Sequence, residues 1–460
     1  MQWHKALNEE MEALRDNNTY ELVPPVEGRS VIGGKWVYAV KFAPGSEEKF
    51  KARYVAKGYS QVQDVDYQET SPTARVTSIW MLLQQAIQDN LMIHQMDVKT
   101  AYLNADIDCE INIEGENFVC KLKKSLYGLK QSGRNWNNML HNFLLSEGFH
   151  QSLVDYCVYT RIVNKVKVII IIWVDDIIIA VINGDIISDV KFSLCNKSKM
   201  KDLGKLSWFL GMEFKFEDDC IKINQTKYLE KILNRFKMSY CNPKSIPCDL
   251  SVSKIISSDS KELCDTRLYR QIVGSLIYVM TGTRQDLSYV VSKLSQHMTK
   301  PTKALFELAK HVLKYVKGTI HYNLKFRKSN SPLKLIGYCD SDWGASEDRR
   351  SITGYSYQLN EDGPLISWKS KKQNVVALSS GEAEYMALTA ALQEANFLRQ
   401  LLTNMQNSNR EPVTLNADNQ GAIVLAKNPV HHQRSKHIDI KYHFIRSEVE
   451  DGIINLQYVP

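Results

Sequence analysis

Two adjacent carboxylates, Asp175 and Asp176, interrupt the most apolar stretch of the sequence, Val168–Ile182. The stretch is shorter than the roughly 18–20 residues of a membrane helix, and two charges at its middle would be costly in lipid. β-Branched residues dominate both halves, which is typical of buried strands. We therefore predict a β-hairpin whose turn carries the acidic pair.

A third carboxylate, Asp97, ends a further predicted strand, Met92–Val98, and alternation places it on the face opposite the Met and Val side chains. A turn or cap is the alternative role for a lone aspartate. If the hairpin lies beside this strand, however, three acids converge, and their mutual repulsion requires a cation between them. Mg²⁺ held by three carboxylates suits phosphoryl transfer to a 3′-hydroxyl with pyrophosphate leaving.

A second set of acids lies in the last third of the sequence. Asp340 ends a strand predicted from Leu333, Asp418 ends the strand that begins at Val413, and Glu382 and Glu384 open a helix predicted over 380–402. Glu384 begins the apolar stripe of that helix, where a carboxylate is costly unless it binds something. Glu382 is explained by an S-x-x-E capping box, so Glu384 is the predicted metal ligand.

The elements around these acids divide the chain into three regions. Residues 1–240 mix short strands with helices, which predicts an α+β fold and includes one strand over 208–216. Residues 241–330 contain a polar linker and three helices, predicted over 269–280, 285–298 and 302–317. Residues 331–460 open with the order β-β-β-α-β-α, which predicts a separate α/β domain.

Composition limits the class of protein. Of the 460 residues, 44% are hydrophobic and 24% are charged, which is typical of a folded chain rather than a disordered one. The nine cysteines include no CxxC pair, which argues against a disulfide framework and favours a reducing compartment. Acidic residues within the first 20 positions exclude a secretory signal. The net charge of +7 favours a polyanionic partner.

Several motifs follow one another in a fixed order. They are KARYVAKG (51–58), HQMDVKTAYLN (94–104), SLYGLKQ (125–131), WVDD (173–176), WFLG (208–211), GYCDSDW (337–343), ALSS (377–380) with EAEY (382–385), and HQRSKHI (432–438). Together they resemble the reverse transcriptase and ribonuclease H region of copia-type LTR retrotransposon Pol polyproteins. The resemblance covers nearly the whole chain.

The resemblance implies a fingers–palm–thumb polymerase followed by a ribonuclease H-like domain. Residues 1–240 would form fingers and palm, 241–330 a linker and thumb, and 331–460 the ribonuclease H-like domain. The implied partners are an RNA template, a DNA primer, an RNA–DNA hybrid and deoxynucleoside triphosphates, with Mg²⁺ or Mn²⁺ as cofactor and no membrane. The implied location is a cytoplasmic virus-like particle with access to the nucleus.

The resemblance also implies roles for single residues. Metal ions would be held by Asp97, Asp175 and Asp176 in the polymerase and by Asp340, Glu384 and Asp418 in the second domain. Nucleotide and primer contacts would come from Lys51 and Arg53 on the triphosphate, Tyr102 under the sugar, Gln131 at the templating pair, and Phe209, Leu210 and Gly211 at the primer end. The alternatives are a solvated face for Lys51 and Arg53 and a core aromatic for Tyr102.

Four lysines of the helix predicted over 302–317 fall on one face: Lys303, Lys310, Lys314 and Lys317. Such a basic stripe is commonly a solvated face. Its position in the implied thumb instead favours contact with a phosphate backbone, which would be independent of sequence and sensitive to salt.

Departures from the family pattern keep a second hypothesis open. Trp173 stands where the family has Tyr or Phe, and the segment after Ile111 is shortened. Ribonuclease H folds add a fourth acid after the last strand, but here that strand is predicted over 453–459, the sequence stops at Pro460, and Asp439 is the only nearby substitute. We therefore expect a C-terminally truncated domain with impaired ribonuclease H activity. The alternative function is a catalytically inactive relic that binds nucleic acid.

Overall fold

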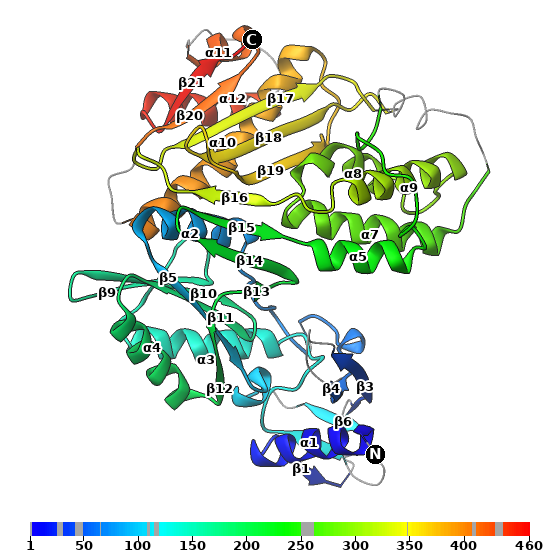
Figure 1. The fold of residues 1–460 in the computed structure, drawn as a ribbon, viewed down its shortest axis with the longest axis vertical. Coiled ribbons are helices and arrows are strands. Elements are labelled where there is room, and N and C mark those ends of the chain that lie inside the picture. The colour runs from blue at the N-terminus through cyan, green and yellow to red at the C-terminus, as the bar shows by residue number, and fades with distance from the viewer. Residues whose placement is uncertain are drawn as a thin grey trace. The chain divides into compact units, whose positions relative to one another are not determined.

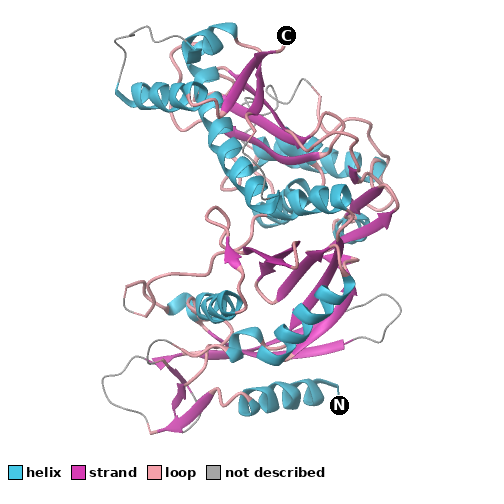
Figure 2. Cartoon of the chain, turned by 90° about the vertical axis from the view of Figure 1, so that its left-hand side faces the viewer, coloured by secondary structure: helices cyan, strands magenta, loops and turns pink. Residues whose placement is uncertain are grey.

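A computed structural model describes residues 2–24, 31–41, 49–64, 66–107, 111–114, 119–249, 262–346, 348–406, 411–427 and 436–460. The chain forms two compact units: unit 1 consists of Met1–Arg75 and Met92–Lys205, and unit 2 of Val76–Leu91 and Leu206–Pro460 (Figures 1 and 2). Within the described residues, no helix combines the length and the apolar character that a membrane span requires.

A six-stranded antiparallel sheet is the centre of unit 1, with strand order β12-β5-β11-β10-β9-β8. Its strands are β5 (Met92–Val98), β8 (His150–Gln151), β9 (Val158–Val163), β10 (Val166–Trp173), β11 (Asp176–Val181) and β12 (Met200–Lys205). The predicted hairpin is confirmed, because Trp173 pairs with Asp176 across the Val174–Asp175 turn. α4 (Gly184–Lys197) packs on β11 and β12 (Figure 1). α3 (Ser132–Ser146) packs on β8.

Smaller elements complete unit 1. α1 (Gln2–Asp16) packs on β4 (Lys49–Ala56), which pairs with β3 (Gly34–Lys41). A second sheet contains β1 (Tyr20–Val23), β7 (Val119–Leu122), β6 (Asn112–Glu114) and β2 (Val31–Ile32). Short 3₁₀ turns are η1 (Gly58–Ser60) and η2 (Ala101–Asn104). Leu14, Ile32 and Leu103 belong to one apolar cluster, which joins α1, the second sheet and η2.

Four helices of unit 2 share one apolar core: α5 (Thr226–Arg235), α7 (Thr266–Gly282), α8 (Ser288–Ser295) and α9 (Lys303–Gly318). Side-chain caps begin two of them, since Asp265 accepts from the amides of Arg267 and Leu268, and Thr302 accepts from Leu305. The helix predicted over 285–298 is shorter, because its first turn is the 3₁₀ helix η3 (Gln285–Leu287). Much of the predicted linker, residues 250–261, lies outside the described residues.

The prediction of one strand over 208–216 is wrong. Trp208–Phe209 (β13) and Met212–Glu217 (β14) form a hairpin, because Leu210 and Gly211 both take positive φ, 48° and 70°. Positive φ at both central residues is the pattern of a type I′ turn. The sheet continues with β15 (Cys220–Asn224) and β16 (Leu324–Arg327), and α2 (Val76–Asp89) packs against it.

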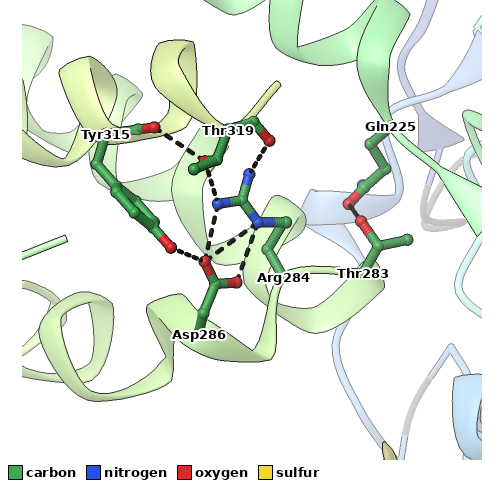
Figure 3. A network of polar contacts seen from close by, with 6 residues as sticks. All are labelled: Gln225, Thr283, Arg284, Asp286, Tyr315 and Thr319. Carbon is green, nitrogen blue, oxygen red and sulfur yellow. Dashed lines mark hydrogen bonds and ion pairs between the residues drawn. The ribbon is translucent and has the colours of Figure 1, made fainter. Parts of the chain in front are cut away.

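A polar network within unit 2 joins the ends of α7 and α9 (Figure 3). Arg284 is only 1% exposed, and its guanidinium donates to the Asp286 carboxylate at 2.8 Å and to Thr319 Oγ1 at 2.6 Å. The Tyr315 hydroxyl also donates to Asp286, and burial raises the pKa of Tyr315 to about 12. Because the guanidinium of Arg284 is buried, removal of Asp286 would leave this charge unpaired and would be strongly destabilising.

A five-stranded sheet forms the C-terminal part of unit 2, in the order β19-β18-β17-β20-β21. Its elements are β17 (Leu335–Asp342), β18 (Ile352–Leu359), β19 (Leu365–Lys372), α10 (Ser380–Gln406), β20 (Val413–Ala417), α11 (Gln420–Lys427), α12 (Lys436–Glu450) and β21 (Ile454–Tyr458). α10 packs across β17 and β18 (Figure 1). The prediction that Asp340 ends its strand is wrong, because pairing of β17 with β18 continues to Asp342. Asp418 was predicted to end the fourth strand, but it is the residue after β20, which ends at Ala417.

Candidate active sites

Three acids of unit 1 lie at one end of its large sheet. Asp97 of β5 and Asp176 of β11 are directly paired residues on neighbouring strands. Asp175 lies in the adjoining turn, where its carbonyl accepts from the amide of Val98 at 2.8 Å. Gln95, which is buried, donates through Nε2 to Asp176 Oδ1 at 2.8 Å and so orients that carboxylate. Carboxylate oxygens are ligands that Mg²⁺ prefers. Among the described residues, however, the acidic group whose ligand atoms all lie within 4.8 Å is the second set, so these three acids share one end of the sheet without meeting as closely.

An aromatic and cationic cluster lies close to these acids. The rings of Tyr102 and Tyr127 are 4.8 Å apart, and the guanidinium of Arg53 lies 4.2 Å from the centre of the Tyr127 ring. Burial raises the pKa of Tyr102, and the charge of Asp175 raises it further. Lys51 and Arg53 share a face of β4, since they are two residues apart on a strand. The structure thus brings Tyr102 and Arg53 near Asp175, as a nucleotide site would require.

Gln131 is held inside the protein. It is 2% exposed, its Oε1 accepts from Gln61 Nε2 at 3.0 Å, and its Nε2 donates to the carbonyl of Asp66 at 3.2 Å. It also precedes α3 directly. Contact with a nucleotide would require Gln131 to exchange these internal bonds, which tie the residue before α3 to Gln61 and Asp66.

Phe209, Leu210 and Gly211 lie in the β13–β14 hairpin of unit 2. Phe209 is 1% exposed and belongs to the core, while the carbonyl of Leu210 accepts from the hydroxyl of Tyr278 on α7. A side chain at Gly211 would collide with the same hydroxyl. The hairpin is therefore anchored on a helix of its own unit.

Three of the four stripe lysines on α9 have partners in the chain. Lys303 pairs with Glu262, Lys310 pairs with Glu307, and Lys317 donates to the carbonyl of Cys241 at 2.7 Å. The two ion pairs, Lys303 with Glu262 and Lys310 with Glu307, lie at the surface and are weak, so a phosphate could displace them. Phosphate binding by Lys303, Lys310 and Lys317 is nevertheless less favourable than binding by unpartnered lysines, because each existing contact must break first.

The second acid set meets closely. Asp340, Glu384 and Asp418 each offer a carboxylate oxygen, and these oxygens all lie within 4.8 Å of one another. Among the described residues this is the acidic group whose ligand atoms come close enough to hold a metal ion, and it gathers them from β17, α10 and the residue after β20. The amide and the hydroxyl of Ser341 both donate to Glu384 Oε1, at 3.2 Å and 2.9 Å.

Burial raises the pKa of Glu384 to about 7, and the carboxylates of Asp340 and Asp418 add to this effect. Burial also raises the pKa of Asp340, with Asp418 as the next cause. A cation at this place would relieve both the repulsion and the loss of hydration. Glu384 is therefore unfavourable as an isolated charge and suited to metal binding.

Glu382, two residues earlier, has a structural role. Its amide donates to Ser379 Oγ at 3.2 Å, and its carboxylate accepts from the amide of Leu378 at 2.7 Å. These two bonds cap the start of α10, much as a capping box does. The side chain of Asp439, the possible fourth acid, lies outside the described residues.

A pocket of about 510 Å³ opens beside the second acid set. Asp340 and Asp418 line one part of it, and Tyr338, Trp368 and Lys369 line another. Acids for metal, aromatic rings for stacking and a cation for phosphate are the groups that a nucleic-acid strand would use.

The pKa of Glu384 predicts how stability depends on pH without metal. Between its ordinary value of 4.5 and about 7, Glu384 is protonated in the folded chain and ionised in the unfolded chain. The unfolding free energy therefore falls as pH rises through this window. We expect Glu384→Gln to remove most of this fall in unfolding free energy. Thermal unfolding of both proteins at about pH 5 and about pH 8 measures it. An equal loss in the variant would contradict the assigned pKa.

Comparison with known proteins identifies the family. The family model for reverse transcriptase (RNA-dependent DNA polymerase) matches residues 17–250. The Pol polyprotein of transposon RE1 from Arabidopsis thaliana is 36% identical over 99% of this chain, and that of transposon TNT 1-94 from Nicotiana tabacum is 37% identical over 97%. The chain belongs to the reverse transcriptase family of copia-type retrotransposon Pol polyproteins.

This copia-type chain spans about a third of the length of those two polyproteins, with 32% and 35% covered. Among solved structures, the foamy viral protease-reverse transcriptase dRH in complex with double-stranded DNA matches all of this chain and 70% of its own, at a TM-score of 0.52 and 11% identity. That likeness shows the reverse transcriptase fold, which the sequence resemblance predicted.

Three residues of the copia-type chain that support the acids were not predicted from sequence. Gln95 orients Asp176, Ser341 orients Glu384, and Trp136 donates to the turn of the acidic pair. Gln95 shares the strand face of Asp97, and Ser341 follows Asp340, so proximity along the chain was an available signal. Trp136 offered no such signal, because it is 38 residues from its partner.

Proposed function

We propose that the chain is an RNA-directed DNA polymerase that extends a DNA primer on an RNA or DNA template. The observation that carries this proposal is the direct pairing of Asp97 with Asp176, with Asp175 in the adjoining turn. Bound Mg²⁺ or Mn²⁺ would activate the primer 3′-hydroxyl and neutralise charge on the triphosphate. Asp97, Asp175 and Asp176 would hold these ions, and Gln95 would keep Asp176 aimed at them.

The neighbouring cluster accounts for nucleotide binding in this proposal. Arg53, and Lys51 on the same strand face, would offset the negative charge of a deoxynucleoside triphosphate. Tyr102 would lie under the sugar. Its ring packs against Tyr127, and the negative charge of Asp175 raises the pKa of its hydroxyl, which indicates that the two groups are close. The primer end would be positioned by Phe209–Gly211, and the template–primer backbone by the basic face of α9.

We propose that the C-terminal part of unit 2 is a ribonuclease H-like domain that cleaves the RNA of an RNA–DNA hybrid, with the impaired activity expected from the sequence. Its support is the meeting of Asp340, Glu384 and Asp418 within 4.8 Å on a mixed five-stranded sheet. A bound divalent ion would supply an activated water for phosphodiester hydrolysis. Ser341 would hold Glu384 in place, and the adjoining pocket would admit the strand.

Primer extension tests the polymerase proposal. With poly(rA)·oligo(dT) and dTTP, the full chain should lengthen the primer when Mg²⁺ or Mn²⁺ is present and should stop when EDTA is added. Extension in EDTA would overturn the metal assignment. Tight binding of the duplex with no extension under any divalent ion would favour the alternative, a nucleic-acid-binding relic.

The sugar contact predicts the effect of Tyr102→Ala. If the ring lies where a ribose 2′-hydroxyl would collide, the smaller side chain should raise ribonucleotide incorporation relative to deoxyribonucleotide by about tenfold or more, since one lost clash is worth about 1.4 kcal/mol or more. Binding of template–primer should change little. The measurement is the ratio of kcat/KM for UTP to that for dTTP. An unchanged ratio would show that Tyr102 is a core aromatic residue without a role in sugar selection.

A further inference from the structure

The turn that carries the acidic pair has an unusual backbone. Val174 and Asp175 are its two central residues, between the closing pair Trp173 and Asp176. Val174 has a φ of +59°, and Asp175 does not share this feature. Positive φ at the first central residue alone is the pattern of a type II′ turn, in which glycine is preferred there. A β-branched residue in this region is strained.

Bonds from outside the turn hold this conformation. The indole Nε1 of Trp136 donates to the carbonyl of Val174 at 2.6 Å, and the amide of Val98 donates to the carbonyl of Asp175 at 2.8 Å. Trp136 belongs to α3 and is 1% exposed. Strained residues persist only where surrounding contacts determine them, and the Trp136 bond is directed at the strained peptide itself.

We propose that Trp136 is a positioning residue for the polymerase acids. Its indole N–H fixes the Val174 carbonyl, and this keeps the turn in the conformation that sets Asp175 and Asp176 beside Asp97. The inference rests on the proposed polymerase function and extends it to a residue that touches neither substrate nor metal. It also explains how a valine is tolerated where the turn favours glycine.

A purely structural role for Trp136 makes a different prediction. A buried indole fills space, so its removal leaves a cavity wherever it packs. That loss would not depend on the residue at position 174. A loss caused by release of a strained turn would depend on it, because glycine takes positive φ without strain. A double-mutant cycle between positions 136 and 174 therefore separates the two roles.

The first test measures steady-state primer extension. Trp136→Phe should lower kcat about 30-fold while the KM values for dTTP and template–primer change less than about threefold. In a Val174→Gly background the same substitution should lower kcat less than about threefold. Val174→Ala is the matched control, since alanine keeps the Cβ, and the full loss should remain. Equal losses in all three backgrounds would overturn the proposal.

A second readout does not depend on activity. Mn²⁺ binding, followed by electron paramagnetic resonance, is measured in a chain whose second site is removed by Asp340→Asn, Glu384→Gln and Asp418→Asn. Trp136→Phe should weaken the remaining binding, and Val174→Gly should restore it. Unchanged binding would contradict the proposal. If the unsubstituted chain does not extend primers, the proposed function fails, yet this measurement still decides the role of Trp136.

A near-isosteric variant covers the case in which Trp136→Phe does not fold. Trp136→benzothienylalanine replaces the indole N–H by sulfur and keeps the size of the ring. It should therefore retain the core packing, lose the bond to Val174, and reproduce the fall in kcat and in Mn²⁺ binding. Full retention of both would show that the hydrogen bond is dispensable and would overturn the proposal.

Discussion

Asp175→Asn should abolish primer extension, with kcat reduced about 10³-fold or more. The substitution keeps the size of the side chain but removes one of three charges that would hold the metal ions beside Asp97 and Asp176. Loss of several kcal/mol of transition-state stabilisation is expected, and about 4 kcal/mol corresponds to a factor of 10³. The measurement is single-turnover extension of a labelled primer with Mg²⁺.

Asp202→Asn provides the matched control for this experiment. Asp202 lies on β12 of the same sheet, but its carboxylate binds Lys191 at 2.8 Å and does not face the acidic pair. Because Asp202 is half-exposed, its ion pair contributes little stability, and extension should stay within about threefold of the unsubstituted chain. If the Asp175→Asn variant were as active as this control, Asp175 would not be a metal ligand.

Glu384→Gln should abolish cleavage of an RNA–DNA hybrid, again by about 10³-fold, and leave primer extension within about threefold. Glu384 supplies one of the three carboxylate oxygens of the second set and is the member held by Ser341. The amide cannot replace a carboxylate charge. The measurement follows a 5′-labelled RNA strand annealed to DNA, with no nucleotides present.

Glu382→Gln is the control on the same helix. The glutamine can still accept from the amide of Leu378, so the cap on α10 is kept. Cleavage should therefore be retained. If Glu382→Gln stops cleavage and Glu384→Gln does not, the assignment of the two glutamates is reversed.

Local sequence patterns were sufficient for the hairpin and for the assignment of buried helix positions. Val168–Ile182 is so rich in β-branched residues that only buried strands fit it, and β10 and β11 form there. The apolar stripe of the helix places Glu384 on the sheet side, and the capping pattern accounts for Glu382. These features depend on spacing along one element, which a sequence displays directly.

Features that depend on distant partners could not be predicted. The β13–β14 hairpin requires positive φ at Leu210, a residue that gives no local turn signal. β17 extends past Asp340 because β18 offers a partner up to Ile352. The lysines of α9 form a stripe in sequence, but the structure engages Lys317 with Cys241, 76 residues away. In each case tertiary contacts decide the outcome.

One assay tests directly whether a single chain holds two separate acid sites with different chemistry. A DNA primer and an RNA template carry different fluorescent labels, and the full chain is added with Mg²⁺ and all four deoxynucleoside triphosphates. With the unsubstituted chain the primer should lengthen and the template should be cut more slowly, while Asp175→Asn should stop only the first change and Glu384→Gln only the second. Loss of both activities in either variant, or binding without any change in either strand, would show that the two acid sites do not act separately.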